Sequence, residues 1–156
     1  MRVGIGFDLH RLGADRPLVL GGVEIPGSPG LIGHSDADCV LHAITDAILG
    51  AAGVGLDIGA LFPDDDPKYK DADSALLLTQ ARAHVPGRIV NVDAVVLAER
   101  PKIAPHREAM RARIAEILGI EVGMVGVKAT TMEGLGPIGA GQAIACQAIA
   151  LIEETS

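Results

Sequence analysis

The chain has 156 residues, of which 49% are hydrophobic, and its 13 basic and 20 acidic side chains give a net charge of −7. This length and apolar content predict one domain, residues 1–156, with a substantial core, and they exclude an intrinsically disordered chain. The acidic balance excludes a protein that grips nucleic acid by neutralising many phosphates, and aromatic residues, 2% of the chain, are too few for base stacking.

The first predicted elements are a strand and a hairpin. Residues 2–7 have the length and the β-branched content of a strand. Residues 18–25 are typical of a hairpin that turns at Gly21 and Gly22, because paired glycines supply the positive φ angles of a tight turn. The following segment, residues 27–33, is expected to be a loop.

A helix is expected next, from Ser35 to about Ala52. Ser35 can cap its N-terminus, Asp36 and Asp38 in the first turn suit the positive end of the helix dipole, and Gly53 ends the helix. The helix carries an apolar stripe formed by Leu41, Ile44, Ile48 and Ala51. This stripe predicts that one side of the helix packs against a core.

The middle of the chain predicts a surface loop and a second helix. Residues 55–70 include a stretch punctuated by prolines and rich in carboxylates, residues 62–67, which is typical of an exposed loop. Asp73 or Ser74 can cap a helix that runs to about His84.

The last part of the chain predicts further strands and a helix. Residues 88–97 and 125–131 predict strands, and residues 105–118 predict a helix with a proline near its first turn. Residues 142–152 follow a glycine-rich stretch, residues 134–141, and are apolar at nearly every position, so either a buried strand or a buried helix fits them. This mixture predicts an α+β or α/β sandwich with helices packed on one face of a mixed β-sheet.

Cysteine spacing and the lack of targeting patterns indicate the cellular compartment. Cys39 and Cys146 form no C-x-x-C pair, which excludes a zinc ribbon and a thioredoxin-type redox site. The N-terminal residues lack the pattern of a signal peptide, and no run of about 18 apolar residues is free of charge. We therefore expect a soluble, cytoplasmic protein with inert thiols that contacts neither nucleic acid nor a membrane.

The first group with metal-binding chemistry is Asp8, His10 and His42. Asp8 and His10 lie two residues apart directly after the first predicted strand, so in extended backbone both side chains point to the same side. With His42 they would supply two nitrogens and one carboxylate oxygen, a set that zinc accepts in sites that keep a fourth position open. A chance spacing of an aspartate and a histidine is the alternative interpretation.

A polar stripe on the first predicted helix strengthens the metal hypothesis. His34, Asp38, His42 and Asp46 recur every four residues, so they are expected on one face, opposite the apolar stripe, with His34 just before the helix cap. A solvated helix face is the alternative. In the functional interpretation, Asp38 and Asp46 orient the histidines by accepting hydrogen bonds from them.

Two further segments carry groups suited to phosphate. One begins at Lys128, near the end of a predicted strand. There this lysine, exposed backbone N–H groups and the hydroxyls of Thr130 and Thr131 would hold phosphate oxygens, and Glu133 would hold a hard divalent cation. An ordinary turn after a strand explains it equally well, and it lacks the P-loop spacing G-x-x-x-x-G-K-S/T. The other, residues 98–104, offers two cations beside a proline and on its own is typical of a strand-to-helix loop.

Five stretches, in this order, together resemble the 2-C-methyl-D-erythritol 2,4-cyclodiphosphate synthase family. They are Gly6-Phe7-Asp8-Leu9-His10, His34-Ser35-Asp36-Ala37-Asp38 followed by Leu41-His42-Ala43, Asp57-Ile58-Gly59 followed by Leu61-Phe62-Pro63-Asp64, Arg100-Pro101-Lys102, and Lys128-Ala129-Thr130-Thr131-x-Glu133. The resemblance runs from Met1 to about residue 152. Several long motifs in register are far more specific than any one of them.

This resemblance implies a small α/β subunit that assembles as a homotrimer, with each active site between neighbouring subunits. It implies a lyase of the non-mevalonate isoprenoid pathway that converts 4-diphosphocytidyl-2-C-methyl-D-erythritol 2-phosphate to 2-C-methyl-D-erythritol 2,4-cyclodiphosphate and releases CMP. The substrate's 2-phosphate would attack its own β-phosphorus, which agrees with the lack of an evident serine or cysteine nucleophile. Two divalent cations would offset the repulsion between the phosphates.

The resemblance also implies roles for the matching residues. Zinc would be bound by Asp8, His10 and His42. The transition state would be stabilised by His34 and Thr131, and Glu133 would bind the second ion, Mg²⁺ or Mn²⁺. The methylerythritol phosphate portion or the ribose would be contacted by Ser35, Asp57, Gly59, Phe62, Asp64 and Asp66. The cytidine diphosphate pocket would be lined by Ala98, Lys102, Ile103, Ala104, Thr130, Thr131, Met132 and Glu133.

The chain departs from the family pattern at three places. Residues 55–57 add one residue, which should only lengthen a loop. Met132 stands where a third threonine is common, and residues 134–140 lack the aromatic residue and the arginine often found in that turn. These two differences bring into question the phosphate and ring contacts expected near Pro137 and Ala140, but they leave the metal ligands in place.

Three other functions are compatible with these residues. A zinc-dependent phosphoesterase would use Asp8, His10 and His42 to activate water. A non-enzymatic protein would use the small-residue C-terminal segment as an oligomer interface and the histidines as structural groups. An additional binding role would place a hydrophobic isoprenoid diphosphate on the axis of a trimer, against the apolar residues 143–152, although ordinary trimer packing also explains that run.

Overall fold

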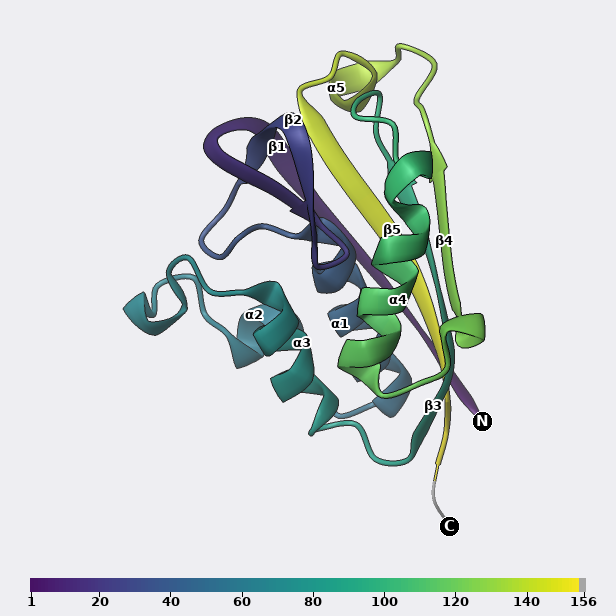
Figure 1. The fold of residues 1–156 in the computed structure, drawn as a ribbon. Coiled ribbons are helices and arrows are strands. Elements are labelled where there is room, and N and C mark those ends of the chain that lie inside the picture. The colour runs from purple at the N-terminus through teal and green to yellow at the C-terminus, as the bar shows by residue number, and fades with distance from the viewer. Residues whose placement is uncertain (155–156) are drawn as a thin grey trace.

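The computed structural model describes residues 1–154 and contains a five-stranded sheet with its longer helices packed on one face (Figure 1). The strands are β1 (Arg2–Leu20), β2 (Val23–Ile32), β3 (Arg88–Leu97), β4 (Val125–Thr130) and β5 (Ala143–Glu153). The helices are α1 (Cys39–Ala52), α2 (Ile58–Leu61), α3 (Ser74–Arg82), α4 (Arg107–Leu118) and α5 (Gly136–Gly139), with 3-10 turns at Pro67–Tyr69, Ala104–His106 and Val122–Met124. This architecture confirms the predicted fold class.

The strands lie in the order β2-β1-β5-β3-β4, and of the strand pairs within residues 1–154 only that of β3 and β4 is parallel. Residues 2–11 of β1 pair with residues 143–152 of β5 in the centre of the sheet. The segment that fitted a strand or a helix is therefore a strand. Its inner side chains are fully buried, and they are Ile144, Cys146, Ala148, Ala150 and Ile152.

β1 is longer than the strand predicted at residues 2–7. It continues to Leu20, because its second half pairs with β2 after its first half has paired with β5. The expected loop at residues 27–33 is wrong, since all but its last residue lies in β2. β2 is an edge strand, where Pro26 and Pro29 are tolerated because the sheet interior loses no hydrogen bond.

Asp38, rather than Ser35, caps α1. Its carboxylate accepts hydrogen bonds from two backbone N–H groups of the first turn, each at 3.1 Å, so Asp36 and Asp38 precede that turn instead of lying in it. The same carboxylate accepts hydrogen bonds from the backbone N–H groups of Gly21 and Gly22, at 2.9 and 2.6 Å. These glycines form the predicted hairpin turn, so one buried side chain joins that turn to the start of α1.

The other boundaries lie close to those predicted. α3 is capped by Asp73 and ends slightly before the expected His84. β3 has the predicted bounds, and β4 ends one residue before the predicted Thr131. α4 starts later than predicted because the proline near its start lies in a 3-10 turn. The loop at residues 55–70 contains α2 and a short 3-10 turn.

α1 lies directly on the backbone of β1 because Gly4 and Gly6 have no side chains. A Cβ atom at Gly6 would overlap the carbonyl oxygen of Ala43, and one at Gly4 would overlap the carbonyl oxygen of Ala47. Most side chains of α1 are buried between the sheet and the other helices. The two glycines therefore fix the height of α1 above β1.

The opposite face of the sheet exposes a row of apolar side chains. On β1 this row comprises Val3, Ile5, Phe7 and Leu9, which are 47–67% exposed. Ile149 of β5 lies opposite Ile5 and is 46% exposed. Within residues 1–154, no helix is long and apolar enough to cross a membrane.

Replacing Gly6 by alanine should lower the free energy of unfolding by about 3 kcal/mol, because the new methyl group overlaps backbone that cannot move without shifting α1. Urea denaturation monitored by circular dichroism measures this loss. Gly123→Ala is the matched control, since apart from its two chain neighbours no residue among 1–154 has a heavy atom within 4 Å of a Cβ at this position. Equal urea midpoints for the two variants would contradict the proposed role of Gly6.

Candidate functional site

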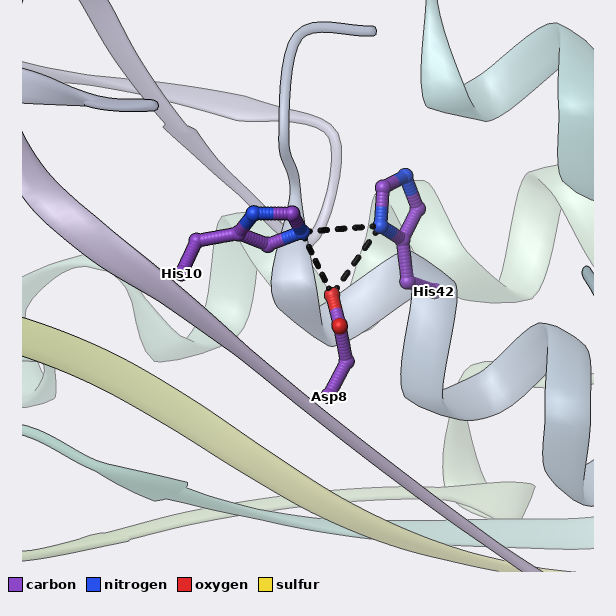
Figure 2. Close-up of side chains that lie close together, drawn as sticks. All are labelled: Asp8, His10 and His42. Carbon is purple, nitrogen blue, oxygen red and sulfur yellow. Dashed lines mark hydrogen bonds and ion pairs between the residues drawn. The ribbon is translucent and has the colours of Figure 1, made fainter. Parts of the chain in front are cut away.

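Asp8, His10 and His42 meet at one point between β1 and α1. The Oδ2 atom of Asp8 lies 2.9 Å from His10 Nε2 and 3.0 Å from His42 Nδ1, and the two nitrogens are 3.3 Å apart. Figure 2 shows the three side chains pointing toward one another. The strand period brings Asp8 and His10 to one side of β1, and the close packing of α1 brings His42 to meet them.

The three donor atoms form a group that can bind a metal ion. Two ligands at about 2.0–2.1 Å from one tetrahedral zinc ion lie about 3.3 Å apart, which matches the separation of the histidine nitrogens. Two imidazole nitrogens and a carboxylate oxygen are also donor types that zinc accepts. The residues therefore fit a divalent metal, with room for a further ligand from the adjoining pocket.

Each imidazole has its second nitrogen held away from this point. His10 Nδ1 lies 2.9 Å from the carbonyl oxygen of Ile32, to which it donates a hydrogen bond. His42 Nε2 lies 2.9 Å from Ser74 Oγ and 3.2 Å from Ser35 Oγ. The nitrogens that face Asp8 are thus left to act as ligands.

The electrostatics of the cluster favour a charged carboxylate. Burial alone would raise the pKa of Asp8, but hydrogen bonds from His10 and His42 outweigh it and hold that pKa well below the usual range. Burial likewise would lower the pKa of His10, but its hydrogen bond with Asp8 raises it above the ordinary value. A proton therefore competes with a metal ion for His10, while Asp8 stays available as a ligand.

The residues of the predicted polar stripe have different roles, and the expected orienting role of Asp38 and Asp46 is wrong. His34 precedes α1, and its Nε2 lies 3.1 Å from the carbonyl oxygen of Asp66. Asp38 and Asp46 do not orient the histidines. Asp38 caps α1, and Asp46 accepts a hydrogen bond of 2.8 Å from the backbone N–H of Ile58, which ties the start of α2 to α1.

A pocket of about 190 Å³ opens beside the metal-binding cluster. Its lining comprises Asp8, His10, Gly33, His34, Ser35, His42, Ile58, Gly59, Phe62, Asp64, Tyr69 and Leu77. Most of the residues that were expected to contact the methylerythritol phosphate portion of the substrate or its ribose thus line this pocket. Asp57 and Asp66 are not in the lining; their side chains accept hydrogen bonds from the backbone N–H groups of Ala60 and Lys68, at 2.7 and 2.9 Å.

A second group of predicted residues lies together elsewhere. Residues 98–104 adjoin residues 130–133, since the backbone N–H of Ala98 donates to the carbonyl of Thr130 at 3.0 Å and that of Met132 donates to the Glu99 side chain at 3.2 Å. Neither segment lines the pocket at the metal-binding cluster. In one chain, the two halves of the predicted site are therefore separate.

Within this second group, solvent reaches most of the predicted residues. Those that are exposed are Lys102, Ala104, Thr130, Thr131 and Glu133, whereas Ala98 and Ile103 are buried. Thr131 Oγ1 lies 3.3 Å from a carboxylate oxygen of Glu133. Lys128, which was expected to hold phosphate, forms an ion pair with Asp93 instead.

Two features of the structure had no signal in the sequence. Ser74 contacts His42 from 32 residues away and was predicted only as a possible helix cap. A shallow hollow of about 750 Å³ at the β4 edge, between Arg107, Arg111 and Asp93, is larger than the pocket but holds none of the predicted site residues except Lys128. The chemistry therefore points to the smaller pocket.

Known proteins resemble this chain over nearly its whole length. The YgbB family model matches residues 1–153. A 2-C-methyl-D-erythritol 2,4-cyclodiphosphate synthase of Gloeobacter violaceus is 57% identical over 99% of this chain and 96% of its own. The bifunctional IspDF of Campylobacter jejuni superposes with a TM-score of 0.90 at 44% identity, over 96% of this chain and 41% of that protein. A CDP-bound 2C-methyl-D-erythritol-2,4-cyclodiphosphate synthase gives 0.88 at 37% identity, over 97% of this chain and 100% of that one.

Replacing His42 by alanine should abolish tight metal binding, because only two protein ligands remain at the cluster. Metal content after dialysis, measured by elemental analysis, tests this loss, and circular dichroism shows whether the fold persists. His84→Ala is the matched control, since His84 is exposed and outside the cluster. A His42→Ala protein that retains the metal content of the unaltered chain would contradict the assignment.

Proposed function

The chain belongs to the YgbB family of 2-C-methyl-D-erythritol 2,4-cyclodiphosphate synthases, and we propose that it cyclises 4-diphosphocytidyl-2-C-methyl-D-erythritol 2-phosphate at the pocket beside Asp8, His10 and His42. The observation that carries this proposal is the three-ligand cluster that opens on a pocket lined by the matching family residues. The product would be 2-C-methyl-D-erythritol 2,4-cyclodiphosphate, with CMP released.

The reaction needs no protein nucleophile. An oxygen of the substrate's 2-phosphate forms a bond to the β-phosphorus, while the bond from that phosphorus to the CMP oxygen breaks, and CMP leaves with the electron pair. The residues around the pocket would fold the substrate so that these groups meet, and well-oriented intramolecular reactions reach effective molarities on the order of 10⁵–10⁸ M. Positioning and neutralisation of charge are therefore the main tasks of the site.

The pocket residues would divide these tasks. Asp8, His10 and His42 would hold zinc, which draws negative charge from phosphate oxygens when bound. His34 lies in the pocket wall and would stabilise charge in the transition state. Gly59 and Phe62 would enclose the methylerythritol portion of the substrate.

The second group of residues would hold the cytidine diphosphate portion. The loop at residues 98–104 and the turn at residues 130–133 lie side by side and present exposed backbone and hydroxyl groups. Thr131 would assist His34 in stabilising the transition state. Glu133 would bind the second divalent ion, Mg²⁺ or Mn²⁺, whose charge would offset that of the phosphates.

A homotrimer would bring the two halves of the site together. In one chain the pocket at the metal-binding cluster and the segment around Glu133 do not meet, so a neighbouring subunit would supply the missing half. The exposed apolar row on β1 and β5, which includes Ile5 and Ile149, is a surface suited to burial between copies. The same apolar row would offer a contact for the isoprenoid diphosphate expected on the trimer axis, although packing between subunits also accounts for it.

Incubation with the cytidylylated substrate, zinc and magnesium should release CMP and the cyclic diphosphate, which chromatography detects. EDTA should stop the reaction, and the His42→Ala variant should be inactive while His84→Ala stays active. Phosphate release from a simple monoester such as p-nitrophenyl phosphate, without CMP release, would identify a phosphoesterase instead.

Mixed trimers should recover activity from two inactive variants if each site spans two subunits. His42→Ala disables the metal half and Glu133→Gln disables the other half, so a random mixture should regain about a quarter of the sites. Coexpression followed by the CMP assay measures this recovery. As the matched control, His42→Ala mixed with Asp8→Asn should stay inactive, because both variants affect the same half. An inactive mixture of the first pair would place both halves in one subunit.

A further inference from the structure

A chain of hydrogen bonds leads from His42 to a second carboxylate behind the metal-binding cluster. His42 Nε2 lies 2.9 Å from Ser74 Oγ, and the Ser74 hydroxyl donates in turn to Oδ1 of Asp36. Asp36 also accepts hydrogen bonds from the backbone N–H groups of Ser74 and Asp38, each at 3.0 Å. Ser74 is completely buried, so no water competes for its hydroxyl.

The direction of these hydrogen bonds shows that Nε2 of His42 carries a hydrogen. The Asp36 carboxylate has no hydrogen to give and can only accept, so the Ser74 hydroxyl must give its hydrogen to this carboxylate. Only lone pairs of Ser74 Oγ then remain to face His42, so Nε2 must carry the hydrogen and donate it. The other ring nitrogen, Nδ1, faces Asp8 and His10, and a bound metal ion would take the place of the hydrogen that Nδ1 otherwise donates to Asp8.

We propose that Ser74 and Asp36 are positioning residues that hold His42 in its metal-binding tautomer. This inference rests on the metal site of the proposed function, and neither residue lines the pocket where substrate would bind. Residues that hold the outer nitrogen of a histidine ligand fix its tautomer and orientation and make it a better donor. Asp36 acts through Ser74, and Ser74 acts through His42.

Ser35 does not replace Ser74 in this role. Its Oγ is farther from His42 Nε2, at 3.2 Å, and already accepts a hydrogen bond of 3.1 Å from the backbone N–H of Ala37. No carboxylate receives the Ser35 hydroxyl hydrogen among the hydrogen bonds of the described residues, so this hydroxyl has no fixed direction. Because Ser35 lines the pocket, its hydroxyl remains free to donate to a phosphate oxygen.

Backbone hydrogen bonds hold the two ends of this chain of hydrogen bonds together. The N–H of Asp36 donates to the carbonyl of Ala72 at 3.0 Å, and the N–H of Asp71 donates to the carbonyl of His34 at 2.7 Å. These bonds pin the segment before α1 against the segment before α3. Ser74, the first residue of α3, is thereby placed between Asp36 and His42.

Ser74→Ala and Asp36→Asn test this inference in the full-length protein. Ser74→Ala removes the acceptor for His42, and Asp36→Asn offers an amide donor that frees the Ser74 hydrogen to turn toward Nε2. Both should weaken zinc binding about 10–100-fold, measured by competition with a chromophoric chelator. The visible spectrum of the Co²⁺-substituted protein should also change, because it reports the ligand field and not overall stability.

Thr79→Val is the matched control, because Thr79 is also on α3 but its hydroxyl donates to the carbonyl of Ala75 and does not reach His42. It should keep the zinc affinity and Co²⁺ spectrum of the unaltered protein. Unchanged zinc affinity in Ser74→Ala or in Asp36→Asn would overturn the inference, as would an equal loss in Thr79→Val. If the unaltered chain itself bound no zinc, the proposed metal site would fall, which the same titration shows separately.

Discussion

The backbone contact between α1 and β1 is the constraint on which the rest of the structure depends. Gly4 and Gly6 let the helix rest on the strand without an intervening layer of side chains. The resulting distance between α1 and β1 brings His42 within contact of Asp8 and His10, which lie on β1. Binding constellations tolerate displacements of only about 0.5 Å, whereas an added side chain would lift α1 by more than that. The metal-binding cluster is therefore a product of packing as much as of ligand chemistry.

The sequence predicted the ligands because their signals were local. Asp8 and His10 follow the period of a strand, and His42 lies on a helix that its cap and apolar stripe predicted, so the fold was needed only to show that the three side chains meet. Strand and helix bounds were also close wherever caps and periodicity agreed. The cap of α1 was mispredicted because Asp38 also accepts hydrogen bonds from the hairpin turn at Gly21 and Gly22, which is distant in the chain. Ser74 was missed as a partner of His42 for the same reason, since 32 residues separate them.

An acidic protein can act on a phosphate-rich substrate when its carboxylates recruit cations. The net charge of −7 gives no general attraction for anions, and Lys128 is already paired with Asp93. In the proposed function, Asp8 and Glu133 would each hold a divalent ion where phosphates must approach one another. This acidity is thus compatible with local, metal-dependent binding of one small phosphorylated substrate.

The carboxylate of Asp38 links two parts of the chain into one cooperative unit. It accepts hydrogen bonds from the β1–β2 turn and from the first turn of α1, and it is wholly buried. If either part opened alone, a buried charge would lose half of its donors, which is costly. The hairpin and the helix that carries His42 should therefore exchange their amide hydrogens together, as one foldon, so that the metal-binding cluster does not come apart piecemeal.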